Sequence, residues 1–162
     1  MSETSKGLEN LIVWRKSLNL VKLVYQTILP FLPIEEKWGL SSQIRRSSNS
    51  IHANIAEGYG RYYYQDNVRF CYIARGSLEE TYSHVRACVE LGYIANEQAT
   101  PVFISILELK KILSGYIQFI KQSKQGEKDG VLDHGGSINE SPSLYEIHGS
   151  DFAFSMSTEE IN

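Results

Sequence analysis

Apolar residues recur at helical spacing along most of the chain, up to about residue 121. In residues 8–29 the most regular stripe consists of Leu11, Trp14, Leu18, Val21, Tyr25 and Ile28. The steps between these positions alternate between three and four residues, which is typical of a helix that packs along one side. Pro30 follows, and a proline disfavours helical geometry in the residue before it. The pattern therefore predicts a helix over residues 8–29.

Residues 30–39 (PFLPIEEKWG) predict a connector whose apolar side chains cover the end of the core. Residues 41–61 (SSQIRRSSNSIHANIAEGYGR) then predict a second helix with a narrow stripe lined by small residues, formed by Ile44, Ser48, Ile51 and Ile55. Small side chains allow a neighbouring helix to approach closely, so this stretch predicts a tight packing surface. We expect Ser41 or Ser42 to cap its start. We expect Gly58 or Gly60 to end it in the left-handed conformation.

Two further helices are predicted after residue 64. One runs from about residue 65 to Gly92, and its inward positions are Phe70, Ile73 or Ala74, Ser77, Thr81, Val85 and Cys88. The other runs over residues 101–121, with Thr100 as its cap and Pro101 at its first position. This last helix is apolar on more than one side, which predicts contact with a further protein surface.

Four helices with short links predict an all-α fold, an antiparallel up-down-up-down four-helix bundle over residues 8–122. A flexible N-terminus, residues 1–7, precedes it. Residues 123–162 are rich in Gly, Ser and acidic residues without a sustained period, and predict a disordered acidic C-terminal tail. Within the tail, Phe152, Phe154 and Met156 form a small apolar cluster. This cluster either docks on a partner or belongs to a solvated extension.

The charge of the chain divides unevenly. Residues 1–125 hold 15 Lys and Arg against 11 Asp and Glu, whereas residues 126–162 hold one Lys and eight acidic residues. Such asymmetry predicts a mildly basic domain with an acidic tail. No apolar run reaches the roughly 18 to 20 residues of a membrane span, and the N-terminus lacks the apolar core of a signal peptide. We therefore expect a cytoplasmic location and no membrane contact.

The chain offers no recognisable constellation for catalysis or for a metal. Di-iron bundles need Glu-x-x-His motifs, whereas Glu80 and His84 are four residues apart. There is no Gly-x-Ser-x-Gly or Walker motif. Cys71 and Cys88 lie 17 residues apart, about 25 Å along one helix, which is too far for a disulfide. We expect two buried thiols, no metal, no cofactor and no enzymatic activity.

Asn54, Glu57 and Gly58 occupy the end of the second predicted helix. A carboxylate is unfavourable near a helix C-terminus, so Glu57 needs a cation, either Arg61 or an arginine of the third helix. We interpret these three residues as a polar lock on the turn between the helices. A ligand-binding role is the alternative.

The arginines in the middle of the chain are the candidate nucleic-acid contacts. These are Arg45, Arg46, Arg61, Arg75 and Arg86. One stripe of the third helix carries Tyr72, Arg75, Glu79, Tyr82 and Arg86. Arginine forks bind phosphates and tyrosines stack on unpaired bases. The alternative is that Glu79 pairs with Arg75, and that the stripe is a subunit contact or a solvated face.

Several segments together resemble a known family. They are Val13-Trp14-Arg15-Lys16-Ser17, Ser42-Gln43-Ile44-Arg45-Arg46, Ser50-Ile51-His52-Ala53-Asn54-Ile55-Ala56-Glu57-Gly58 with Gly60-Arg61, Phe70-Cys71-Tyr72-Ile73-Ala74-Arg75-Gly76-Ser77-Leu78-Glu79-Glu80, and Leu91-Gly92-Tyr93-Ile94. The pattern resembles the four-helix-bundle proteins encoded in 23S ribosomal RNA intervening sequences. These are relatives of the accessory variability determinant proteins of diversity-generating retroelements.

The resemblance implies an all-α bundle that assembles as a homopentamer. In the retroelement relatives it also implies a basic surface that binds nucleic acid and a reverse transcriptase. The acidic tail beyond Gln122 and the low charge of the domain depart from that pattern. We expect a non-enzymatic oligomer that binds RNA or DNA, or that serves a ribonucleoprotein or reverse transcriptase as an accessory factor. The alternative is a protein-interaction scaffold without nucleic-acid binding, whose tail recruits a partner.

Overall fold

The computed structural model describes residues 3–123, and these contain helices and no strand, which confirms the all-α prediction. The elements are α1 (Glu3–Asn10), α2 (Ile12–Thr27), the short 3-10 helices η1 (Leu29–Phe31) and η2 (Ile34–Lys37), α3 (Leu40–Tyr59), α4 (Tyr64–Glu90) and α5 (Asn96–Ser123). The predictions for the tail and its Phe152, Phe154 and Met156 fall outside the described residues.

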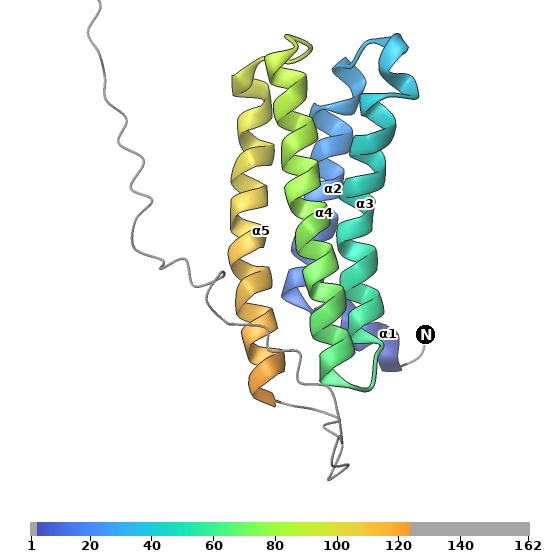
Figure 1. Cartoon of the computed structure of the whole chain (residues 1–162), viewed down its shortest axis with the longest axis vertical. Helices are drawn as coiled ribbons and strands as arrows, with labels where there is room; N and C mark the ends of the chain where they lie inside the picture. Colours follow the sequence, from blue (N-terminus) through green and yellow to red (C-terminus); the bar gives the residue numbers. More distant parts are fainter. Residues whose placement is uncertain (1–2, 124–162) are drawn as a thin grey trace, which may run out of the picture. The chain divides into compact units, whose positions relative to one another are not determined.

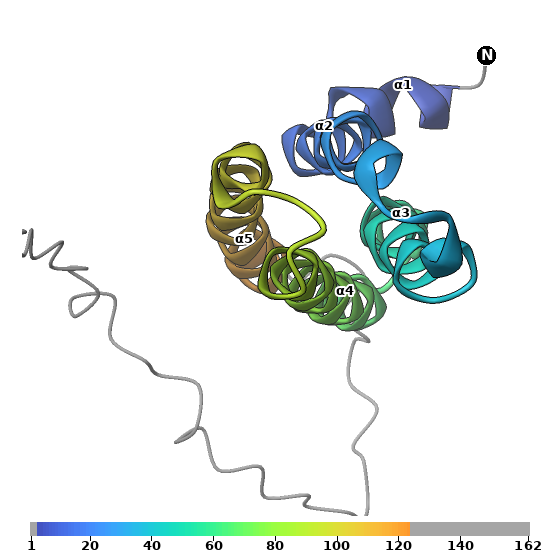
Figure 2. The ribbon, with the colours of Figure 1, turned by 90° about the horizontal axis from the view of Figure 1, so that it is seen from above.

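The four long helices lie side by side in chain order, and α5 returns to pack against α2 (Figures 1 and 2). Contacts between α4 and α5 give their relative direction. Tyr72, early in α4, meets Lys121 near the end of α5, whereas Arg86, late in α4, meets Asn96 at the start of α5. These two helices are therefore antiparallel.

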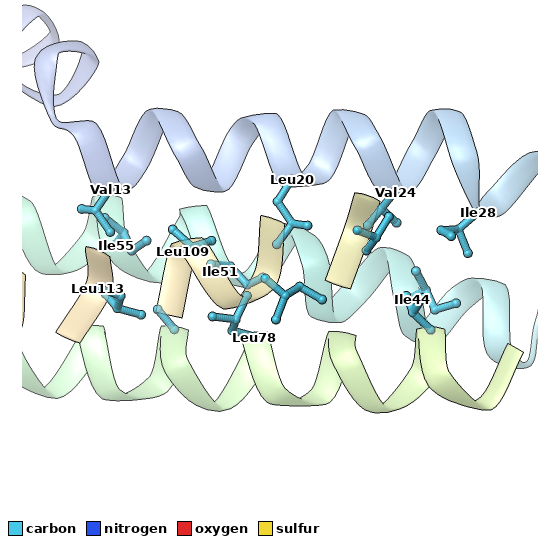
Figure 3. Packing of buried hydrophobic residues seen from close by; sticks show 14 of the residues in the cluster. Val13, Leu20, Val24, Ile28, Ile44, Ile51, Ile55, Leu78, Leu109 and Leu113 are labelled. Carbon is cyan, nitrogen blue, oxygen red and sulfur yellow. The ribbon is translucent and has the colours of Figure 1, made fainter. Parts of the chain in front are cut away.

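The core runs along the axis between these four helices, and each contributes large aliphatic side chains to it (Figure 3). The largest of the fully buried side chains are Leu20, Ile28, Ile44, Ile51, Ile55, Leu78, Ile106, Leu109 and Leu113. Burying one such side chain stabilises the fold by about 1.5 to 3 kcal/mol relative to leaving it in water.

The predicted first helix is wrong in its extent and in its buried stripe. The helix is interrupted at Leu11, whose backbone is extended (φ −72°, ψ 113°), and α2 ends at Thr27. The buried residues of α2 are Val13, Ser17, Leu20 and Val24. Of the predicted stripe, Ile28 is fully buried, Leu11 and Trp14 are partly buried against the core, and Tyr25 is 41% exposed. Two apolar stripes adjoin on this helix, and the more regular of the two flanks the core.

The predicted connector also differs from the structure. Ile34 and Trp38 are 76% and 82% exposed, so they do not cover the end of the core. The 3-10 turn of η2 instead directs Glu36 inward, where its carboxylate accepts hydrogen bonds from the Leu40 amide (2.8 Å) and the Tyr93 hydroxyl (3.1 Å). A glutamate of the connector therefore caps α3, and the predicted serine cap is wrong.

The predicted stripe of α3 is confirmed, and that of α4 is confirmed except at Phe70, which is only partly buried while Cys71 beside it is in the core. Ile44, Ser48, Ile51 and Ile55 are buried on α3, and Ala74, Ser77, Thr81, Val85 and Cys88 are buried on α4. Gly92 ends α4 as expected, with a left-handed φ of 72°. Its amide and that of Tyr93 bond to the carbonyls of Val89 and Cys88, the pattern of a Schellman motif.

α5 begins earlier than predicted. It starts at Asn96 and contains Pro101, while the Thr100 hydroxyl bonds to the Asn96 carbonyl inside the helix (2.8 Å) instead of capping it. Ala99 and Val102 are fully buried, so the packing of the additional turn outweighs the amide bond that the proline cannot make.

α3 and α4 approach each other closely along their small residues. The Ser47 and Thr81 hydroxyl oxygens lie 3.0 Å apart, and so do those of Ser50 and Ser77. Gly58 continues the helix, because α3 runs on to Tyr59 and Gly60 has φ −77°. The predicted left-handed end is therefore wrong, and the buried Gly58 serves close packing against α4.

Candidate nucleic-acid interface

Arg45 and Arg46 diverge onto different sides of α3, because successive helical residues are about 100° apart. Arg46 pairs with Glu80 of α4. One turn after Arg45, Asn49 donates a hydrogen bond to the Tyr25 hydroxyl of α2 (2.9 Å). Arg45 therefore lies on the α2 side of α3, and these two arginines do not form one phosphate site.

Arg61 lies just after α3 and pairs with Glu57 (2.5 Å), which confirms the expected compensation of that carboxylate. Its guanidinium also lies over the Phe70 ring, 5.0 Å from the centroid. Asn54 donates to the Ser50 carbonyl and hydroxyl (2.7 and 2.9 Å), both on its own helix. Of the three residues predicted to lock the turn, Gly58 is the one that packs against α4.

The stripe of Tyr72, Arg75, Glu79, Tyr82 and Arg86 follows the seam between α4 and α5. Along it, Glu79 pairs with Lys110 (2.5 Å), and the ring centroids of Tyr82 and Phe103 are 5.1 Å apart. Arg86 pairs with Glu90 of its own helix (2.8 Å). The alternative pairing of Glu79 with Arg75 is wrong, since Lys110 of α5 occupies that carboxylate.

Three residues of this seam, Tyr72, Arg75 and Lys121, form a compact group that we call the Tyr72 cluster. The Arg75 guanidinium carbon lies 4.8 Å from the Tyr72 ring centroid, and the Lys121 ammonium lies 5.4 Å from it. Lys121 also donates a hydrogen bond to the Tyr72 hydroxyl (2.9 Å). The structure thus places the Arg75 guanidinium against the Tyr72 ring, a contact worth about 0.5 to 1 kcal/mol at an exposed site, and the Lys121 ammonium at the hydroxyl end of the same side chain.

The charge of the Tyr72 cluster is not compensated locally. Within residues 3–123, neither Arg75 nor Lys121 makes an ion pair, in contrast to Arg46, Arg61 and Arg86. Tyr72 itself is 39% exposed. An accessible ring with two unpaired cations is suited to an anionic, aromatic ligand.

Lys121 is the member of the cluster that sequence reasoning missed. Its position, 49 residues from Tyr72, carries no local motif. Only the antiparallel pairing of α4 and α5 brings the two side chains together.

Comparison with known proteins assigns the chain to a family. The model of the 23S rRNA-intervening sequence protein matches residues 9–115. The chain belongs to the 23S rRNA-intervening sequence protein family. No curated protein matches it.

This intervening-sequence protein is also similar to a crystal structure from Bacteroides thetaiotaomicron, a protein of unknown function from the S23 ribosomal protein family. The two are 31% identical with a TM-score of 0.59, and the match covers 66% of this chain and 99% of the other. The family match includes the five predicted arginines and ends before Lys121. The Tyr72 cluster thus joins the matched region to the last turn of α5.

The thiols of this intervening-sequence protein are buried, as expected. Cys71 and Cys88 are free and lie on α4. Burial raises the pKa of the Cys71 thiol to about 12 and that of the Cys88 thiol to about 11. Both are therefore neutral core side chains at neutral pH.

Residues 3–123 hold no group of three or more His, Cys, Asp or Glu placed to bind a metal ion. None of their helices has the length and hydropathy to cross a membrane.

Proposed function

We propose that this intervening-sequence protein is a non-enzymatic RNA-binding protein whose Tyr72 cluster contacts the nucleic acid. The observation that carries the proposal is a pair of cations that make no ion pair within residues 3–123: Arg75 against the Tyr72 ring, and Lys121 at the Tyr72 hydroxyl. An arginine fork suits phosphate, and a lysine adds a point charge beside it. The ring offers a stacking surface, worth about 1 to 3 kcal/mol per unpaired base.

Single-stranded RNA is the form that this chemistry favours. Bases inside a duplex are stacked on one another, whereas loops and single strands expose base faces to aromatic side chains. Membership of the 23S rRNA-intervening sequence protein family and the similarity to a protein from the S23 ribosomal protein family support RNA as the partner. Binding of DNA, or association with a reverse transcriptase, is the variant of this proposal that the retroelement resemblance suggests.

The other predicted arginines can contact phosphate with little loss of the free energy of their present ion pairs. Arg46, Arg61 and Arg86 each make an ion pair whose arginine side chain is 47% to 63% exposed. Exposed pairs are worth about 0 to 1 kcal/mol, so a phosphate can replace the carboxylate. Arg45 makes no ion pair within residues 3–123 and adds charge on the α2 side.

The test is the salt dependence of RNA binding by the full chain. Fluorescence anisotropy with a labelled single-stranded RNA, and with DNA of the same sequence, gives the dissociation constant at several salt concentrations. Two or three neutralised phosphates predict that the logarithm of the association constant falls with the logarithm of the salt concentration, with a slope of roughly −1.4 to −2 for a single strand. A flat response contradicts RNA binding, and tighter binding of the DNA assigns the site to DNA.

The exposed aliphatic side chains of α5 favour a second role, in protein assembly. Ile104 and Leu107 are 61% and 55% exposed on the side of α5 away from the core. We propose that this face joins copies of the chain into an oligomer, a pentamer if the family resemblance holds. Light scattering should give a mass several times 18.4 kDa, and Ile104→Gln with Leu107→Gln should lower it. A monomeric mass for the unmodified chain contradicts assembly.

The scaffold alternative places partner recruitment in the tail. Deletion of residues 126–162 should then abolish capture of the partner, while the Tyr72 cluster has no part in it. Retained capture after the deletion contradicts this role.

A further inference from the structure

A cavity of about 400 Å³ opens at the end of the structure where α3 and α5 end and α4 begins. Its volume is in the range of small-molecule sites, about 300 to 1,000 Å³. The side chains that give it chemical character are Tyr59, Arg61, Tyr62, Asn67, Tyr116 and Phe119. Four aromatic rings, one amide and one guanidinium thus surround a single space.

The Asn67 amide in this cavity has unused hydrogen-bonding capacity. Its nitrogen donates to the Tyr116 hydroxyl and its oxygen accepts from the Cys71 thiol, both at 3.5 Å. At 3.5 Å the contact with the hydroxyl is longer than an ordinary hydrogen bond and correspondingly weak. A half-buried amide gains free energy when a ligand completes its hydrogen bonds. The oxygen lies against Gly58 and the Cys71 thiol, so the amide nitrogen is the atom that can donate to an acceptor on a base edge.

Arg61 supplies the cation of the same cavity. One terminal nitrogen of its guanidinium is held by Glu57, and the guanidinium fork carries five donors in all. Tyr62, which also lines the cavity, is 74% exposed and offers an accessible ring face. A base with an attached phosphate therefore finds rings, an amide and a cation within one space.

The cavity and the Tyr72 cluster share the last turn of α5. Ile120 and Ser123 line the cavity, and Lys121 between them belongs to the Tyr72 cluster. One strand of nucleic acid that lies on the cluster can therefore continue into the cavity. We propose that the cavity takes one unpaired base of the bound RNA, with Asn67 at the base edge and Arg61 at its phosphate. This inference rests on the proposed RNA binding.

The first experiment uses mononucleotides and the full chain. Uridine 5′-monophosphate and adenosine 5′-monophosphate are titrated separately while the side-chain amide resonances of Asn67 are followed by NMR, with inorganic phosphate as the reference anion. We expect saturable shifts of the Asn67 amide with at least one nucleotide, and no such shift with phosphate. Equal shifts with phosphate, or nucleotide binding that leaves Asn67 unchanged, overturn the inference.

Substitutions distinguish binding of a nucleotide in the cavity from general attraction of an anion to the positive charge of the protein. Arg61→Gln should weaken nucleotide binding by about tenfold, since hydrogen bonds to charged groups are the stronger ones. Arg15→Gln, which removes an exposed charge from α2, should leave nucleotide binding within about twofold. Arg61→Lys keeps the charge without the fork and should recover part of the affinity. Equal losses for Arg61→Gln and Arg15→Gln overturn the inference.

The two proposals fail in different ways. RNA binding with the predicted salt slope, but without nucleotide shifts at Asn67, overturns the cavity assignment alone. Absence of RNA binding by the full chain overturns the proposed function, and with it the assignment of the cavity to RNA.

Discussion

Gly58 of α3 lies so close to α4 that a Cβ atom at this position would be 2.9 Å from Oδ1 of Asn67. The contact joins the packing of the fold to the proposed site, because Asn67 also lines the cavity at this end of the molecule. Close approach of the two helices thus fixes the position of the amide that we assign to a base edge.

Gly58→Ala should destabilise the protein. The added methyl group also meets the Asn67 carbonyl oxygen and the Phe70 Cβ at 3.0 Å, so these neighbours have to give by a few tenths of an ångström. Overpacking of this kind costs about 1 to 3 kcal/mol in the free energy of unfolding. Urea denaturation followed by circular dichroism measures the change.

Gly76→Ala is the matched control in the interior of α4. Apart from its chain neighbours and the backbone of its own helix, no atom of the described residues lies within 4 Å of the position of its Cβ. Alanine is a better helix former than glycine by about 0.5 to 1 kcal/mol. This variant should be stabilised. If both variants shift the unfolding midpoint in the same direction, the close-packing role of Gly58 is wrong.

The hydroxyl pair of Ser47 and Thr81 should contribute to stability as a coupled unit. Both residues are fully buried, so Thr81→Val leaves the serine hydroxyl without its interhelical partner. We expect a loss of about 1 to 3 kcal/mol for Thr81→Val. The double variant Ser47→Ala, Thr81→Val should lose less than the sum of the single variants. A double-mutant cycle measures the difference, and strict additivity would falsify the coupling.

Thr100→Val provides a comparison with an exposed hydroxyl. Among the residues that the structure describes, this side chain bonds to the carbonyl of Asn96 in its own helix and to no other group. A change within about 0.5 kcal/mol is expected, as for most surface substitutions.

The two thiols should react with Ellman's reagent only after unfolding. Burial raises the pKa of Cys71 to about 12, and the thiolate is the reactive form. At pH 8 the native protein should therefore label far more slowly than the protein in 6 M guanidinium chloride, in which both cysteines react. Rapid labelling of the native protein contradicts the burial of the two thiols on α4.

Acid should destabilise the protein partly through His52. Burial lowers the pKa of this imidazole from 6.5, so below that pH the unfolded state binds more protons than the native state. The free energy of unfolding then rises with pH through this range and falls as the pH is lowered. His52→Gln should make the free energy of unfolding depend less steeply on pH between about pH 5 and 7. An unchanged slope in denaturation curves at several pH values contradicts this contribution.

Sequence patterns predicted the parts of the fold that depend on neighbouring residues. The stripe of Ile44, Ile51 and Ile55 on α3 follows from helical periodicity alone. The end of α4 at Gly92 follows from the freedom of glycine to adopt a positive φ.

Features decided by tertiary packing were not predictable in the same way. Periodicity favoured the stripe through Tyr25, but contact with the other helices buries Val24 instead. The cap of α3 by Glu36 depends on the 3-10 turn of η2, which directs that carboxylate back to the Leu40 amide.

The candidate site was likewise only half predictable. Tyr72 and Arg75 share a helix, so their proximity follows from their spacing. Lys121 joins them through the register between α4 and α5, and Asn67 gains its place in the cavity through the packing of three helices. Neither relationship has a signature in the local sequence.

The central claim is that the Tyr72 cluster binds RNA, and the most direct test is the affinity of the full chain carrying Arg75→Gln and Lys121→Gln for a single-stranded RNA. The matched control, Arg15→Gln with Lys111→Gln, removes the same charge from exposed positions on α2 and α5. We predict that the cluster variant binds at least about tenfold more weakly, with a salt slope smaller by roughly 1.4, while the control stays within about twofold. Equal affinities for the two variants would contradict the assignment.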